Sequence, residues 1–166
     1  PPPPPPPFFF STHIPESAIL SGLVGSEMCI RDRINIETDS QKLYEITNIV
    51  SRTIDKQDIS EGMITLYIKH TSASLLIQEN ADDSVLRDLE NFFDNLVPQN
   101  LDLYEHKAEG VDDMPAHIKA SLTSTHLSIP IRNKKIDLGT WQGIFLFEHR
   151  IQSHTREIDI HIIGTH

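Results

Sequence analysis

Cysteine is nearly absent from this sequence, and its scarcity excludes several classes of protein. Cys29 is the only cysteine among 166 residues. The chain therefore cannot form an internal disulfide, a zinc site made of thiolates or an iron–sulfur centre. The nine histidines become the conspicuous reactive side chains.

Basic residues and long apolar runs are also scarce. The chain has 14 Lys and Arg against 24 Asp and Glu, which gives a net charge of −10. Such a charge repels nucleic-acid phosphates and anionic lipid headgroups. No apolar run approaches the ~18–20 residues that a membrane span needs. We therefore expect a cytoplasmic protein that binds neither nucleic acid nor a membrane.

Proline is scarce except at the start of the chain, where Pro1–Pro7 precede Phe8–Phe10. Uninterrupted cytosine and thymine tracts encode Pro and Phe, and residues 23–32 back-translate to a string similar to a transposon-based sequencing adapter. We therefore interpret residues 1–33 as a non-native extension rather than a Pro-rich linker or a signal peptide. A single domain is expected over residues 34–166, with a net charge of −9 and no cysteine.

The periodicity of the apolar residues from Ile34 onward predicts an α+β fold. Apolar residues three or four apart predict helices that begin at Ser40, at Asn80 or Ala81, and near Pro115. Alternating apolar residues predict strands over 63–69, 74–78, 127–131, 143–148 and 156–163. Because strands and helices follow no regular alternation, we expect a two-layer sandwich in which helices cover a largely antiparallel sheet.

Three polar clusters combine histidines, carboxylates and turn residues. The first contains residues 70–74 and 78–80, the second runs over 106–119, and the third runs over 138–143 and continues along a strand to residue 150. Histidines and carboxylates together suit proton transfer or cation binding. The functional site is therefore expected in these clusters.

The second cluster supplies candidate catalytic residues. Glu109, Asp112, Asp113 and His117 can gather around one point, although Asp113 is also a natural N-cap for the helix that contains Pro115. Lys119 is a candidate for binding a substrate phosphate.

Histidines of the same cluster are candidate metal ligands. His106 and His117 would bind one Zn²⁺ or Mg²⁺ ion, with His149 or His70 as the third ligand. Neighbouring carboxylates would accept the other ring protons. A metal-free cluster of hydrogen bonds explains the same residues.

The first cluster offers a histidine beside several hydroxyl groups. His70 is a candidate catalytic residue, and Thr71, Ser72 and Ser74 can donate hydrogen bonds to an anionic ligand, with Asn80 as a further ligand-binding residue. The alternative to a functional role is that His70 is a half-buried, hydrogen-bonded histidine at a strand end. A Ser–His nucleophile is disfavoured because no G-x-S-x-G turn accompanies the cluster.

The third cluster offers an aromatic surface and a cation. Trp141 and Gln142, between Gly139 and Gly143, can stack on and hydrogen-bond to a planar heterocycle. Glu148 and Arg150 are also assigned to ligand binding. Arg150 either binds a phosphate or carboxylate or pairs only with Glu148.

In this order, the motifs HTSASL, ENADDSV, H…EGVDDMPAHIK, LGTWQGI and EHR resemble the YjbQ-like family, known as secondary thiamine-phosphate synthases. The resemblance covers about residues 34–164. It implies a homotrimer in which the polar clusters meet at or near subunit boundaries. One departure from the family is Asn133 to Lys135, which replaces a glycine-bearing turn, and Asn133 is expected to take the left-handed conformation there.

The resemblance implies weak thiamine-phosphate synthase activity, which joins a pyrimidine diphosphate to a thiazole phosphate. The substrate would be a small phosphorylated heterocycle, and a divalent metal would help to bind its phosphates because the domain is acidic and has only five glycines. A metal-assisted hydrolase that uses the histidines and carboxylates is one alternative. A trimer that binds a phosphorylated metabolite without turning it over is another.

Overall fold

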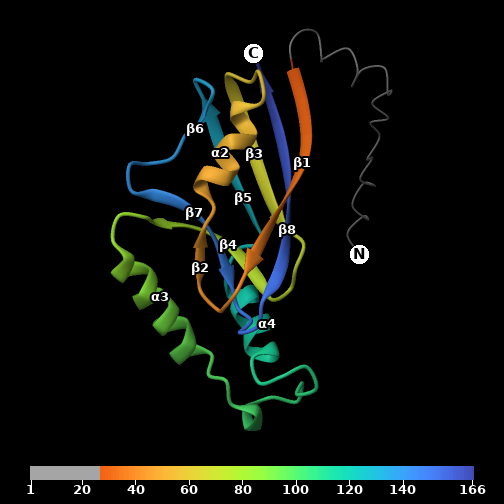
Figure 1. Ribbon diagram of the computed structural model, residues 1–166, viewed down its shortest axis with the longest axis vertical. Coiled ribbons are helices and arrows are strands. Elements are labelled where there is room, and N and C mark those ends of the chain that lie inside the picture. Colours follow the sequence, from red (N-terminus) through yellow and green to blue (C-terminus); the bar gives the residue numbers. More distant parts are fainter. Residues whose placement is uncertain (1–26) are drawn as a thin grey trace, which may run out of the picture.

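Residues 27–166 are described by the computed structural model, and they form two antiparallel β-sheets and three α-helices (Figure 1). The five-stranded sheet has the order β1–β8–β3–β5–β6, and the three-stranded sheet has the order β2–β7–β4. The strands are β1 (Glu27–Thr38), β2 (Leu43–Glu45), β3 (Glu61–Ile68), β4 (Ala73–Glu79), β5 (His126–Arg132), β6 (Lys135–Ile136), β7 (Gln142–Glu148) and β8 (His154–Thr165). The helices are α2 (Thr47–Asp55), α3 (Asp83–Leu96) and α4 (Asp113–Leu122), with a short 3-10 helix, η1 (Leu101–Leu103), before α4.

The main hydrophobic core lies between the two sheets and α2. Alternate residues of β3 and β8, such as Leu66 and Ile160, are buried in it together with Ile144 of β7. The intervening β7 residues Phe145 and Phe147 face the other side of the small sheet, where α3 partly covers them. The α+β class and the antiparallel pairing are confirmed. The single sheet covered by helices is wrong, because a second sheet covers the inner face of the first.

Most of the predicted elements are confirmed, but the helix expected from Ser40 begins only at Thr47. Leu43 to Glu45 instead pair with β7 as β2. The spacing of Leu43 and Ile46 resembles a helical face, yet these two side chains belong to different cores. A strand that changes into a helix between them lets each reach its own core.

The two later helices begin close to the predicted positions. The Asp82 side chain accepts a hydrogen bond from the Ser84 N–H at 2.8 Å and caps α3. Asp112, not Asp113, occupies the N-cap position of α4, and it makes no capping bond with its side chain. That carboxylate is used elsewhere in the site, as described below.

The expected domain boundary at Ile34 falls inside β1, and it stays a prediction. Glu27 to Arg33 pair with Thr165 to Asp159 of β8. Backbone pairing needs only donors and acceptors, so the free edge of β8 accommodates these residues whatever their origin. Residues 1–26 lie outside the described part of the chain, and the interpretation of the extension as non-native stays a prediction.

The turn between β5 and β6 has the expected left-handed backbone. Asn133 has a φ of 51° and Lys134 a φ of 64°. Two such residues between paired Arg132 and Lys135 make the tight hairpin loop whose twist matches that of the strands. The prediction for Asn133 is confirmed.

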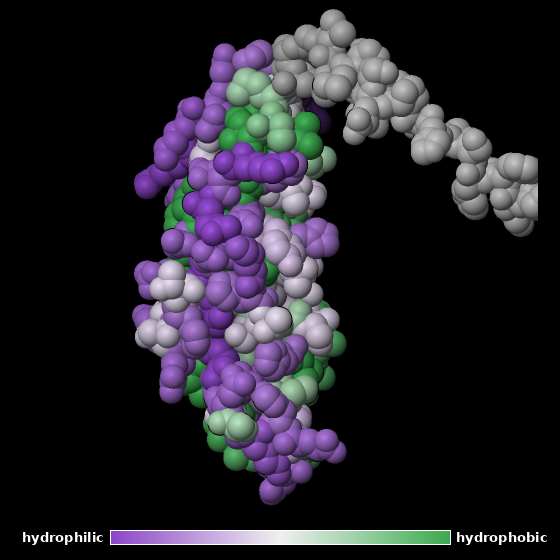
Figure 2. Space-filling model, turned by 90° about the vertical axis from the view of Figure 1, so that its right-hand side faces the viewer, coloured by the Kyte–Doolittle hydropathy of each residue, from purple (hydrophilic) through white to green (hydrophobic). Residues whose placement is uncertain are grey.

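Within residues 27–166, no helix has both the length and the apolar character of a membrane span. Figure 2 shows an elongated molecule from the side that lies to the right in Figure 1, with hydrophilic side chains over most of the middle of this face. The turn from β3 to β4 and helix α4 lie close together at one end of the sandwich.

Candidate functional site

Two histidines and one aspartate converge at the start of α4. His106 Nε2 lies 2.7 Å from Asp113 Oδ2, and His117 Nε2 lies 3.3 Å from the same oxygen. One ligand atom from each residue lies within 4.8 Å of the others. His117 follows Asp113 by four residues, so one turn of α4 places both on the same face. Asp113 is buried, whereas both histidines reach the surface.

The surroundings of His117 favour a cation between these groups. Its Nδ1 lies 3.1 Å from the Thr71 carbonyl oxygen, which only accepts hydrogen bonds, so Nδ1 carries the ring proton. In the neutral ring, Nε2 then turns its lone pair toward the Asp113 carboxylate, which is also an acceptor. A proton or a metal ion between them removes this repulsion. Imidazole nitrogens with one carboxylate suit Zn²⁺ better than Mg²⁺.

Arg150 neutralises and orients the acidic segment. Its Nε donates to Asp112 Oδ2 at 3.0 Å, Nη1 pairs with Asp113 Oδ1, and Nη2 donates to the Glu109 carbonyl at 2.8 Å. Burial acts to raise the pKa of Asp112, but hydrogen bonds from the Ile151 N–H and from Arg150 bring it below its ordinary value. Because Arg150 holds the other oxygen of Asp113, Oδ2 faces the two histidines.

A buried ion pair lies behind this segment. The Arg156 guanidinium donates to the Glu148 carboxylate at 2.5 and 2.6 Å, and both side chains are almost completely buried. Burial acts to raise the pKa of Glu148, but Arg156, the Arg150 N–H and the Thr38 hydroxyl lower it below its usual range. Arg156 also donates to Ser72 Oγ at 3.1 Å.

An open hollow of about 570 Å³ adjoins His117. It lies between the end of β3 with its following turn and the C-terminal part of α4. Lys69 and Thr71 line one side, and Ser121 and Thr125 line the other. Its size is that of a small-molecule site, so a ligand there would lie beside a candidate metal ligand.

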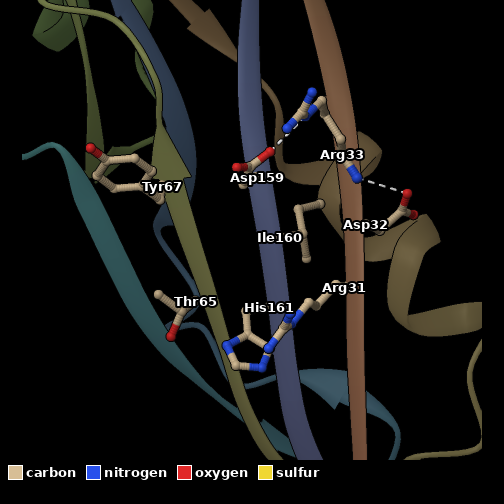
Figure 3. Close-up of a pocket in the computed structure, with 8 residues that line it drawn as sticks. All are labelled: Arg31, Asp32, Arg33, Thr65, Tyr67, Asp159, Ile160 and His161. Atoms are coloured by element: carbon tan, nitrogen blue, oxygen red, sulfur yellow. Dashed lines mark hydrogen bonds and ion pairs between the residues drawn. The ribbon is translucent and has the colours of Figure 1, made fainter.

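A larger hollow of about 730 Å³ lies on the outer face of the five-stranded sheet, between residues of β1, β3 and β8 (Figure 3). One of its cations is already paired, since Arg33 donates to Asp159 at 2.6 Å and to Glu157 at 3.1 Å. One wall, Arg31 to Arg33, belongs to the segment interpreted as an extension. We therefore place the functional site at α4.

Comparisons with known proteins match this fold and nearly the whole described chain. The family pattern described as "UPF0047 protein YjbQ-like" matches residues 32–165. The chain belongs to this family. It is 46% identical over 129 residues to a UPF0047 protein of Synechocystis, which covers 78% of this chain and 88% of that protein. It is 41% identical over 132 residues to YjbQ of Escherichia coli O157:H7, and this match covers 79% of this chain and 95% of that protein.

Solved structures of YjbQ-like proteins share the fold. A protein of unknown function from Sulfolobus solfataricus superposes with a TM-score of 0.76 at 24% identity, over 83% of this chain and 99% of that one. An uncharacterised YjbQ/UPF0047 protein of Clostridium acetobutylicum superposes with a TM-score of 0.71 at 33% identity, over 79% and 98%. The resemblance to the YjbQ-like family and the α+β fold it implies are thereby confirmed.

The structure gathers part of the expected metal set and leaves out His149. His106 and His117 meet as predicted, but Asp113 accompanies them in place of a third histidine. His149 is buried, and its Nε2 lies 2.9 Å from the Ser74 hydroxyl. The pKa of His149 falls to about 3 because burial penalises the charged ring, and because Lys119 and Arg156 are nearby.

His70, expected to be catalytic or a metal ligand, accepts a backbone hydrogen bond through one ring nitrogen. Its Nε2 accepts the Glu157 N–H at 2.9 Å, and its Nδ1 lies 3.4 Å from the Arg156 guanidinium. Burial and the charge of Arg156 lower the pKa of His70. His70 therefore helps to hold the chain between β3 and β4. It also lines the hollow beside His117, and its role in proton transfer stays a prediction.

Several residues expected to bind ligand are committed to internal contacts. The Lys119 ammonium is buried and donates to Asp94 at 2.5 Å, so it is unavailable to a phosphate. Ser74 is completely buried, so its contact with His149 is not a nucleophilic pair open to substrate. Ser72 is also largely buried and holds Arg156. Thr71, by contrast, lines the hollow beside His117.

The roles of the remaining acidic and basic residues also differ from expectation. Glu109 is exposed and contributes its carbonyl rather than its carboxylate to Arg150. Gly110 follows it with a φ of 115°, a conformation that favours glycine. Arg150 pairs with Asp112 and Asp113, and Glu148 pairs with Arg156. Arg150 is therefore a residue that orients the site, not a free phosphate ligand.

Trp141, Gln142 and Asn80 lie at the opposite end of the small sheet. The Asn80 N–H donates to the Trp141 carbonyl at 3.1 Å, and the Trp141 side chain is 64% exposed. Strand β7 runs from Gln142 to Glu148, a length of about 20 Å, before it reaches the site. One chain therefore does not bring these residues to the histidines.

Sequence reasoning missed Arg156 and Thr38, which complete the buried ion pair. A signal for Arg156 was present, because it lies in register with Ile158, Ile160 and Ile162 on the buried face of β8. A charged residue in line with core residues needs a buried partner. No pattern indicated which carboxylate that partner was.

Proposed function

We propose that this protein is a metal-dependent enzyme acting on a small phosphorylated heterocycle, with its metal ion held by His106, Asp113 and His117. The observation that carries the proposal is the convergence of these three ligand atoms within 4.8 Å. The His117 tautomer fixed by Thr71 supports it, because Nε2 is left as the ligand atom. Two imidazoles and one carboxylate also leave coordination positions for water or substrate.

The resemblance to secondary thiamine-phosphate synthases makes transfer the first candidate reaction. The thiazole nitrogen would attack the carbon that carries the diphosphate, and the carbon–oxygen bond would break with release of pyrophosphate. A bound metal ion would supply the positive charge that stabilises the leaving group. The chain would orient the substrate through Thr71, Ser121 and Lys69, which line the hollow beside His117.

The positions of Trp141 and Gln142 support a homotrimer as the active form. They lie at the far end of β7, a strand about 20 Å long, from the end that leads to the site, so stacking on a substrate at the metal would need a second copy. The exposed indole is available to such a contact. We therefore propose that neighbouring subunits complete one another's sites.

A second candidate is a metal-assisted hydrolase, favoured by the engagement of the cationic residues. Arg150 and Lys119 already hold carboxylates, which leaves few free cations for a substrate pair that carries three phosphate groups. Hydrolysis of a single phosphoester needs only the metal and a bound water.

Turnover assays distinguish these functions. The zinc-loaded protein would be incubated with the pyrimidine diphosphate and the thiazole phosphate, and thiamine phosphate and pyrophosphate would be quantified. Equal amounts of both products, lost in the His117→Ala variant, are expected for the transferase. Phosphate release from single heterocyclic phosphates would replace that proposal with the hydrolase. Binding without any product would indicate a non-catalytic protein.

A further inference from the structure

We propose that the buried pair Glu148–Arg156 is the positioning unit of the metal centre, although neither residue touches the candidate ligands. The inference rests on the metal centre proposed above. It follows from two chains of hydrogen bonds that leave this pair and end on two different ligands, Asp113 and His117.

The first chain runs through Arg150. Glu148 Oε1 accepts the Arg150 N–H at 2.9 Å, which fixes the backbone just beyond the end of β7. From that position the Arg150 guanidinium reaches Asp113 Oδ1 and Asp112 Oδ2. The orientation of the Asp113 carboxylate, and so the direction of Oδ2, therefore depends on Glu148.

The second chain runs through the turn between β3 and β4. Arg156 Nη2 donates to Ser72 Oγ at 3.1 Å and to the Ser72 carbonyl at 3.5 Å. They hold the residue after Thr71, while the Glu157 N–H, next to Arg156 in the chain, holds the residue before it through His70 Nε2. The Thr71 carbonyl between them accepts the His117 ring proton. Arg156 thus controls which nitrogen of His117 faces Asp113.

The carboxylate of the pair is fully hydrogen-bonded. The Glu148 carboxylate accepts two bonds from Arg156, one from the Arg150 N–H and one from the Thr38 hydroxyl at 2.8 Å. Burying two charges is costly, and a buried ion pair is often no more stabilising than apolar residues of similar size. A role in fixing the geometry of the ligands accounts for its place directly behind the site.

Zinc titration of variants tests this role. In Arg156→Lys the charge is kept, but a single ammonium cannot hold both oxygens of Glu148 and Ser72 together. In Glu148→Gln the shape is kept and the charge is lost. Each is expected to weaken Zn²⁺ binding about 10- to 100-fold, as loss of a residue that orients a ligand typically does. The ¹⁵N shifts of the His117 ring in the zinc-free protein should also show a changed tautomer population.

The matched control is Val50→Ala, which creates a cavity in the core beneath α2. This cavity destabilises the fold but lies away from the site. If Val50→Ala weakens zinc binding as much as Arg156→Lys does, the pair acts only through stability. If the wild type binds zinc and both pair variants bind it equally well, the positioning role is wrong and the metal centre stands. If the wild type binds no zinc, the metal centre itself is wrong. If Glu148→Gln does not fold, Thr38→Val takes its place in the experiment, because it removes one hydrogen bond to Glu148.

Discussion

At the scale of single residues, burial sets the protonation state of His149. His149 is 1% exposed, and its pKa of about 3 keeps the ring neutral in the folded protein. In the unfolded chain the ring has the ordinary pKa of about 6.5. Between these two values the unfolded state binds the extra proton, so protonation pulls the equilibrium toward unfolding.

The free energy of unfolding is therefore expected to fall as the pH falls from 6.5 toward 3. Inside this window, His149 lowers the free energy of unfolding by up to about 1.4 kcal/mol for each pH unit. His149→Gln keeps a polar partner for Ser74 but cannot titrate, so its denaturant-unfolding curves should give a shallower pH dependence. Parallel pH profiles for the wild type and the variant would contradict this account of His149.

The sequence indicates which residues form the candidate centre, but not every role within it. Asp113 and His117 are predictable as neighbours because four residues make one helical turn. The burial of Lys119 was not predictable, because its partner Asp94 lies on α3 and comes close only in the tertiary structure. Proximity within one helix follows from local geometry, whereas pairing between helices depends on the complete fold.

At the scale of elements, β1 tests where the domain begins. A shortened chain starting at Ile34 loses the pairing of Glu27 to Arg33, but β8 stays hydrogen-bonded to β3 along its other edge. Ile36, the buried apolar residue of β1, is retained, whereas the partly buried Met28 and Ile30 are lost. We expect this chain to fold and to keep its thermal midpoint within a few degrees in scanning calorimetry. Failure to fold would show that residues 27–33 belong to the folded unit.

The separation of the strands into two sheets could not be predicted from the sequence, because strand pairing, like the pairing of Lys119 with Asp94, depends on the complete fold. Alternation of apolar and polar residues identifies a strand and its buried face, as it does for β3 and β8. It does not identify the partner strand, and β2 pairs with β7 about a hundred residues later. β2 is also too short, at three residues, for its alternation to be recognised.

At the scale of the whole molecule, the proposed trimer predicts a change around Trp141. This residue is the only tryptophan in the chain and is largely exposed in one subunit. Sedimentation equilibrium at micromolar concentration should give three times the chain mass, and dilution that dissociates the trimer should shift Trp141 emission to longer wavelength. A monomer at micromolar concentration would rule out the homotrimer.

The central claim concerns the metal centre, and metal content tests it most directly. Untagged protein purified without chelator would be analysed for metals, beside His117→Ala and a matched control, His126→Ala, which removes an exposed histidine outside the cluster. About one Zn²⁺ per chain is expected in the wild type and the control, and none in His117→Ala, with the fold retained in all three. Added Zn²⁺ at 100 times its Kd should stabilise the wild type by about 2.7 kcal/mol. Wild-type protein that contains no metal and gains no stability from Zn²⁺ would contradict the account and leave only a hydrogen-bonded cluster.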